Sequence, residues 1–187
     1  MSGGSGLECG FRESATLDAV LSAHAVALGS DFAGYRNHAY RVANLCLALS
    51  PSDDADTWER IAIAAAFHDL GIWTAGTFDY LKPSIGLAND HLARENQAAW
   101  APEIETMILE HHKLSRYRRH PEWLAEPFRK ADFVDLSKGM VRFGLPRALV
   151  MELYEQWPDA GFHKRLVRLS LARLKTHPWN PLPMVRW

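Results

Sequence analysis

An adjacent histidine and aspartate, His68 and Asp69, follow a run of alanines in the segment AAAFHDLG at residues 64–71. A segment this apolar predicts a buried helix, in which a carboxylate is strongly unfavourable unless it is paired or binds a cation. Further histidines and carboxylates fall on apolar helical stripes elsewhere, namely His38, His91, His111, His112 and Asp132. Imidazole and carboxylate groups together suit divalent first-row metals such as iron or manganese. The sequence therefore predicts a buried site for a divalent transition metal.

Helical periodicity ranks these candidates. In EIETMILEHHK, Ile104, Ile108 and His111 share one stripe, whereas the next residue is turned by roughly 100°. We therefore expect His111 to bind metal and His112 to face a substrate. In EWLAEPFRKADFVDLSK, Asp132 is spaced four residues from apolar neighbours and is the expected ligand, with Asp135 as the alternative.

The elements that must position these residues are predicted to be helices. The apolar periodicity indicates helices at about residues 17–29, 30–51, 58–71, 86–99, 102–114, 121–142, 146–156 and 160–176. Residues 72–86, which mix glycine, proline, threonine and aromatic residues, predict a long loop near the His-Asp pair. No segment alternates with a period of two for long enough to predict a strand. The expected fold class is all-α.

The composition predicts one globular domain. With 187 residues, 48% of them hydrophobic, the chain can bury a core that needs no disulfide or metal for folding. We expect a flexible N-terminus at residues 1–10, a single helical domain at 11–177 and an extended tail at 178–187. The two cysteines, Cys9 and Cys46, indicate neither a disulfide framework nor a thiolate metal site, which fits a reducing cytoplasm.

The charge balance limits the partners that the chain can attract. The formal net charge is −1 and the charged residues are scattered, which disfavours a nucleic-acid polymer or an anionic membrane as partner. No run approaches eighteen apolar residues, and the N-terminus lacks the pattern of a secretory signal. A small-molecule partner is expected, and a homodimer is compatible with the sequence.

The order of the candidate ligands resembles that of the HD-domain superfamily, helical metal-dependent phosphohydrolases named for their adjacent His-Asp pair. The family has a first histidine, then His-Asp, then a distant aspartate. Here YRNHAYRV supplies His38, AAAFHDLG supplies His68 and Asp69, and FRKADFVD supplies Asp132, a match over about residues 32–140. The resemblance implies an HD-type helical bundle around a buried metal site.

Members with two metals carry two further histidines before the last aspartate, and His91 and His111 stand at corresponding places here. The resemblance implies a dinuclear site in which Asp69 bridges two ions. It also implies hydrolysis of a small, phosphorylated ester or anhydride. Relatives with the same extra histidines hold two irons and activate dioxygen, so an oxygenase is the alternative. A metal-stabilised binding or regulatory module is the third possibility.

The residues expected to act on the substrate are less specific. We predict catalytic roles for Asp69, His112 and Lys113, and anion or substrate binding by Arg41, Tyr80, Lys82, Lys113 and Arg116. Many family members carry a polar residue three positions after the Asp of the pair, but Ile72 stands there in this chain. Either other residues hold the anion or the substrate is less charged than a nucleotide.

Overall fold

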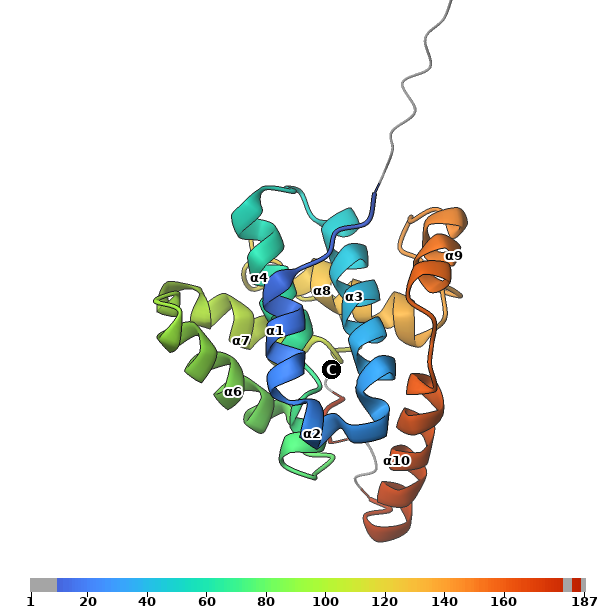
Figure 1. Cartoon of the computed structure of the whole chain (residues 1–187). Helices are drawn as coiled ribbons and strands as arrows, with labels where there is room; N and C mark the ends of the chain where they lie inside the picture. The colour runs from blue at the N-terminus through green and yellow to red at the C-terminus, as the bar shows by residue number, and fades with distance from the viewer. Residues whose placement is uncertain (1–9, 180–182, 186–187) are drawn as a thin grey trace, which may run out of the picture.

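The computed structural model describes residues 10–179 and 183–185, and all regular structure in them is helical (Figure 1). The predicted all-α fold class is confirmed. The helices run over Ala15–Ala23 (α1), Ala25–Leu28 (α2), Phe32–Leu49 (α3), Ala55–Phe67 (α4), Gly71–Thr74 (α5), Leu81–Arg94 (α6), Ala101–Glu110 (α7), Ala125–Leu136 (α8), Arg147–Gln156 (α9) and Phe162–Thr176 (α10). Residues 1–9 of the predicted flexible N-terminus lie outside the described residues, as does half of the predicted extended tail, whose described part contains turns at 178–179 and 183–184.

Helix α3 is the centre of the bundle and packs against both α4 and α8. The repeated small residues of α4 explain the close packing, because Ala62, Ala64, Ala65 and Ala66 are fully buried. Each of two neighbouring helices begins at a side-chain cap: Ser14 accepts a hydrogen bond from the first turn of α1, and Asp54 from that of α4. The Tyr40 hydroxyl of α3 donates to the Ser14 carbonyl and so joins α3 to the start of α1.

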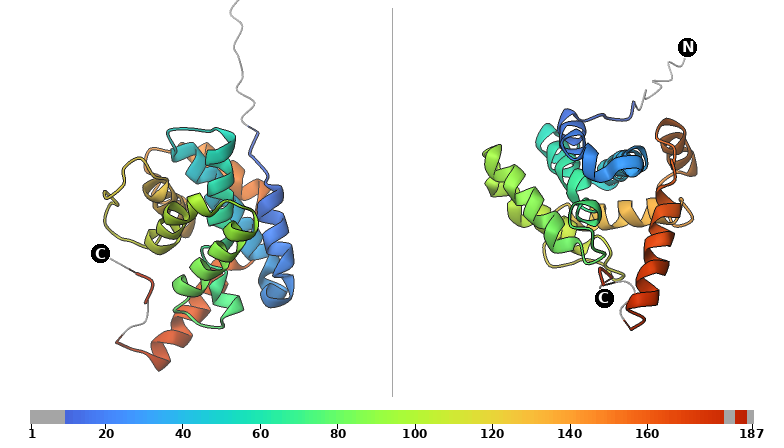
Figure 2. Two further views of the ribbon diagram at one scale, coloured as in Figure 1. Left: turned by 90° about the vertical axis from the view of Figure 1, so that its left-hand side faces the viewer. Right: turned by 60° about the horizontal axis from the view of Figure 1, so that its bottom comes forward.

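Two helix pairs lie on opposite sides of this centre. Helices α6 and α7 pack against each other on one side, whereas α9 and α10 follow α8 on the other (Figures 1 and 2). Helix α10 contacts α3 along one side and stands at the edge of the bundle. One face of α10 therefore stays free of other helices.

The predicted loop at residues 72–86 is only partly a loop. Helix α5 begins at Gly71, and α6 begins at Leu81, five residues earlier than predicted. The early start is possible because Pro83 lies in the first turn of α6, where its missing N–H would have no helical partner. Gly71 lets the two helices approach, because a Cβ there would lie 2.5 Å from the Tyr80 carbonyl oxygen.

Two other predicted helices are shorter in the structure. Helix α7 ends at Glu110 rather than at residue 114, and α8 spans Ala125–Leu136 rather than 121–142. The chain at Lys138 and Gly139 has positive φ angles, which end α8. Within residues 10–179 and 183–185, no helix has the length and apolar character needed to cross a membrane.

Candidate metal centre

Four predicted ligands from three helices meet in the core. His38 comes from α3, His68 and Asp69 from the end of α4, and Asp132 from α8, and all four side chains are buried. The Nε2 atoms of His38 and His68 are 3.0 Å apart. The Asp69 Oδ2 atom lies 3.5 Å from His68 Nε2 and 3.8 Å from His38 Nε2. The Asp132 Oδ1 atom lies 3.6 Å from His38 Nε2.

The hydrogen bonds of the outer ring nitrogens fix the state of both histidines. His38 Nδ1 donates to the Asp135 carboxylate at 2.6 Å, and His68 Nδ1 donates to the Ala65 carbonyl at 2.8 Å. Burial lowers the pKa of His38, and lowers that of His68 to about 3, so both rings are neutral near pH 7. Each Nε2 therefore presents a lone pair, and two lone pairs 3.0 Å apart cannot hydrogen-bond to each other. A shared cation would satisfy both atoms.

A second pair of histidines faces the other oxygen of Asp69. His111 Nε2 lies 3.4 Å from Asp69 Oδ1, and its Nδ1 donates to the Ile108 carbonyl at 2.7 Å. His112 Nδ1 lies 3.4 Å from Asp132 Oδ2. The rings of His111 and His112 are only 3.9 Å apart because α7 has already ended and the chain turns there. Asp69 thus lies between two pairs of imidazoles.

The unsatisfied atoms of the cluster test whether it suits a cation. Asp69 Oδ1 and both Asp132 carboxylate oxygens are buried without a hydrogen-bond partner among the described residues. Two groups have donor atoms that all lie within 4.8 Å of one another: His38, His68 and Asp69, and also Asp69, His111 and His112. Neutral imidazoles and carboxylates are ligands for a divalent first-row metal. The donor set fits one such ion in each group, with Asp69 common to both.

The two carboxylates of the cluster have opposite pKa shifts. Burial acts to raise the pKa of Asp69, but the neighbouring rings of His68 and His111 hold it well below its usual range. Burial and the charges of Asp69 and Asp135 raise the pKa of Asp132 well above its usual range, although His111 opposes the shift. Two carboxylates this close in a dry site disfavour joint ionisation, and positive charge between them removes the conflict.

Asp135, the alternative ligand, holds the cluster from outside. Its carboxylate accepts hydrogen bonds from His38 Nδ1 and from both Nε and a terminal nitrogen of Arg41, at 2.6, 2.5 and 2.9 Å. A carboxylate on the far nitrogen of a ligating histidine sets its tautomer and orientation. The position of Arg41 does not support the prediction that it binds substrate, because its guanidinium is fully buried and bound to Asp135 and to two backbone carbonyls. Periodicity alone did not separate the roles of Asp132 and Asp135.

The structure does not bring His91 to the cluster, and the prediction that it binds metal is not supported by its position. The buried stripe of α6 contains Ala88 and Leu92, and His91 is turned away from Leu92 by about 100°. Its ring packs against Phe67 at 5.4 Å between centroids. It lines a hollow with Glu59 and belongs to neither group of donor atoms, whereas His112 joins Asp69 in one of them.

Three predicted cationic residues also lie elsewhere. Lys82 is exposed on α6, and Lys113 forms an ion pair with Glu110 at 3.9 Å. Arg116 is exposed and lines a separate hollow beside Glu126. Each of the three follows a helix end or lies on an outward helix face. Their closeness in sequence to a candidate site residue therefore did not predict their positions. Neither the two donor groups nor the cavity beside them contains any of the three among the described residues.

Tyr80 is the predicted substrate-side residue that the structure places at the cluster. Its hydroxyl lies 2.8 Å from His112 Nε2 and 3.4 Å from His111 Nε2. Burial and the charge of Asp69 raise the pKa of Tyr80 well above its usual value, so the phenol keeps its proton in its hydrogen bond with His112. Tyr35 supports the cluster from the other side, since its hydroxyl accepts from the Asp69 backbone N–H at 3.2 Å.

A cavity of about 410 Å³ opens beside the cluster, and Tyr80 and His112 belong to its lining. This volume lies in the usual range for small-molecule sites. The metal-compatible groups therefore border a space that a small molecule can enter. Compared with known protein families, curated proteins and solved structures, the chain shows no match.

Proposed function

We propose that this chain is a metal-dependent hydrolase of a small phosphate ester or anhydride. The observation that carries the proposal is the position of Asp69, whose two carboxylate oxygens face different pairs of histidines. Asp69 would thus be able to help hold a cation with either group of histidines. The resemblance of the His-Asp order to the HD-domain superfamily supports the same assignment.

The chain supplies the ligands on both sides of Asp69. His38, His68 and Asp132 would hold one ion, and His111 and His112 the other. A divalent metal at such a site lowers the pKa of coordinated water and so supplies a nucleophile at neutral pH. The hydrogen bonds from His68 and His111 to backbone carbonyls keep each Nε2 directed into the site.

Tyr80 would supply the proton that the leaving group needs. In hydrolysis the water oxygen forms a new bond to phosphorus, and the bond from phosphorus to the ester oxygen breaks. The departing oxygen takes the electron pair and needs one proton, which balances the proton that the water loses. Tyr80 lines the cavity and its hydroxyl retains its proton, so Tyr80 is the donor.

The proposal is tested by metal content and hydrolysis measured together. Protein purified without chelator is analysed for bound metal, and hydrolysis of an aryl phosphate is measured with added manganese. Asp69→Ala should remove both the metal and the activity while circular dichroism stays helical. His91→Ala is the matched control, because this histidine lies outside both donor groups and should change neither quantity. Activity that survives Asp69→Ala, or protein that binds no metal after reconstitution, would refute the proposal.

Oxidation of a small apolar molecule at the same cluster is the second candidate. The observation that favours it is the cavity lining, which contains no lysine or arginine among the described residues. The donor set, without cysteine, also suits iron. Close to two irons per chain, together with oxygen consumption and no phosphate release, would favour this candidate over hydrolysis.

A further inference from the structure

The cavity beside the cluster has an unusual composition for a site that binds a phosphorylated molecule. Its walls come from the segment before α6, from α8, from one face of α10 and from the described part of the chain end. The lining residues are Phe78, Tyr80, His112, Leu136, His163, Leu166, Val167, Ser170, Leu171, Met184 and Val185. Most of this surface is hydrocarbon.

The few polar groups in the wall are mostly engaged already. His163 is hydrogen-bonded through Nδ1 to Asp159 and donates from Nε2 to the Asp135 carbonyl. Tyr80 and His112 are bonded to each other at the end of the cavity next to Asp69. None of the described lining residues is a lysine, arginine, aspartate or glutamate. A charged or strongly hydrated group placed along this wall would lose its water without gaining partners.

One face of α10 presents apolar side chains that no other described element covers. Val167 and Leu171, one helical turn apart, line the cavity and yet remain 58% and 54% exposed. Met184 also lines the cavity and is buried in one apolar cluster with Tyr80 and Leu81. A molecule lying in the cavity along α10 would cover both Val167 and Leu171.

We infer that the substrate carries an extended apolar body, alkyl or aromatic, that lies along α10, with its reactive group at Tyr80 and His112. The inference rests on the proposed function in placing the reaction at the Asp69 cluster. It names the substrate class more narrowly: a monoester of an apolar alcohol or phenol rather than a nucleotide or sugar phosphate. Recognition of the substrate then comes mainly from burial of its hydrocarbon, and polar contacts are confined to the end of the cavity at Tyr80 and His112.

The test uses non-hydrolysable n-alkylphosphonates from ethyl to hexyl, whose binding is measured by displacement of a fluorescent anilinonaphthalene sulfonate. If each added methylene is buried, affinity should rise about fourfold per methylene until the cavity is filled. Val167→Asp should weaken binding of the hexyl compound about tenfold or more, because it places a charge against the chain. Leu174→Asp is the matched control, since it lies on the same helix, is similarly exposed at 46%, and does not line the cavity.

The outcomes separate this inference from the proposed function. Affinity that does not change with chain length in the wild-type protein would overturn the inference, as would equal effects of Val167→Asp and Leu174→Asp. Repeating the series in Asp69→Ala isolates the apolar wall, because the dependence on chain length should persist there after metal and turnover are lost. A flat series with intact metal-dependent hydrolysis would leave the function standing and remove the apolar substrate.

Discussion

Replacement of Asp135 by alanine should destabilise the protein more than removal of any surface ion pair. The Asp135 and Arg41 side chains are fully buried, and the carboxylate is the only counter-ion that Arg41 contacts among the described residues. Although burial acts to raise it, hydrogen bonds from His38 and Arg41 hold the pKa of Asp135 well below its usual range. Without this carboxylate, the charge of Arg41 would face the carbonyls of Trp157 and Pro158 and the ring of Tyr154, none of which is an anion. Breaking a buried pair in this way costs about 3–5 kcal/mol.

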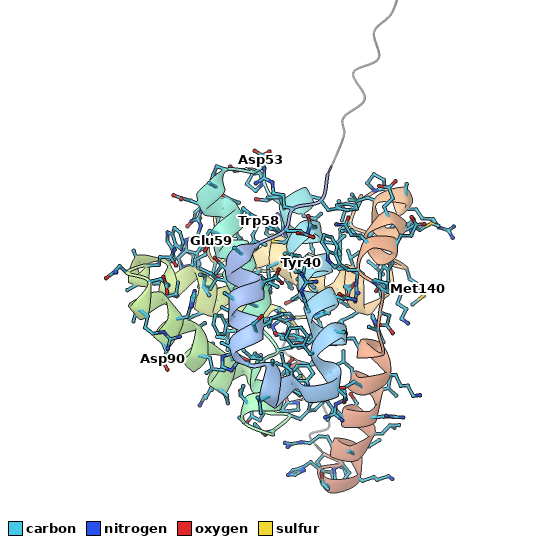
Figure 3. The ribbon with its side chains drawn as sticks, viewed as in Figure 1. Tyr40, Asp53, Trp58, Glu59, Asp90 and Met140 are labelled. Carbon is cyan, nitrogen blue, oxygen red and sulfur yellow. The ribbon has the colours of Figure 1, made fainter. Side chains whose placement is uncertain are left out.

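Urea unfolding followed by circular dichroism measures this loss directly. The matched control is Asp53→Ala, because Asp53 lies 3.7 Å from Arg12 with 85% of its side chain exposed, in the link between α3 and α4 (Figure 3). An exposed pair of this kind contributes less than about 1 kcal/mol. Asp135→Ala should therefore lower the unfolding free energy several times more than Asp53→Ala.

A double variant separates the unpaired charge from the loss of packing. Adding Arg41→Met to Asp135→Ala removes the orphaned guanidinium and should recover part of the lost stability, because a buried pair can be replaced by apolar groups at little cost. If Asp135→Ala loses no more than Asp53→Ala, the reasoning about the buried charge is wrong. If the double variant is no more stable than Asp135→Ala alone, the assignment of the loss to the unpaired Arg41 charge is also wrong.

Three further predictions concern the helices around the cluster and the metal itself. Gly71→Ala should lower the free energy of unfolding in urea by about 1–3 kcal/mol, because the new Cβ would lie 2.5 Å from the Tyr80 carbonyl oxygen. The control is Gly86→Ala, which should leave the stability unchanged or raise it, because a Cβ at this position on α6 would meet no atom within 4 Å. Asp54→Ala should destabilise α4 near neutral pH. Hydrogen bonds from Ser52 and the first turn of α4 lower the Asp54 pKa to about 2. The ionised carboxylate therefore stabilises the folded state above its ordinary pKa, and the difference in unfolding free energy between wild type and Asp54→Ala should shrink as the pH falls from about 4 to about 2. A difference in unfolding free energy that does not change with pH would contradict this. A divalent metal that binds only the folded chain should stabilise it by about 2.7 kcal/mol at a hundred times its Kd, so the absence of any melting shift on chelation would count against the site.

The sequence predicted the ligands that lie on strongly apolar stripes. His38, His68, Asp69, His111 and Asp132 are buried where the helical period placed them, because each follows or precedes apolar residues one turn away. The helical periodicity did not predict where the helices end, however, and these ends decide where residues such as His112 lie. The end of α7 at Glu110 brings His112 beside His111, although a continued helix would have turned it aside.

The predicted roles that the structure does not support belong to residues whose environment depends on distant segments. His91 occupies a helical position next to the buried stripe, and the packing of α6 against α7 and α4 decides which side is buried. Arg41 has the spacing of an inward residue, but its partners lie 94 to 117 positions further along the chain. No local pattern distinguishes a buried structural arginine from one that binds an anion. The apolar cavity likewise forms from segments between residues 78 and 185 that have no pattern in common.

The ends of α4 and α7 have an electrostatic consequence for ion selection. His68 and His111 are the residues that close these two helices, and each ring donates to a carbonyl of the last turn. The carbonyl end of a helix carries about half a unit of negative charge. Two such ends converge on the same core, so the main chain itself contributes a negative potential there. Cations would therefore be favoured over anions at this place even in a variant that lacks one of its carboxylates.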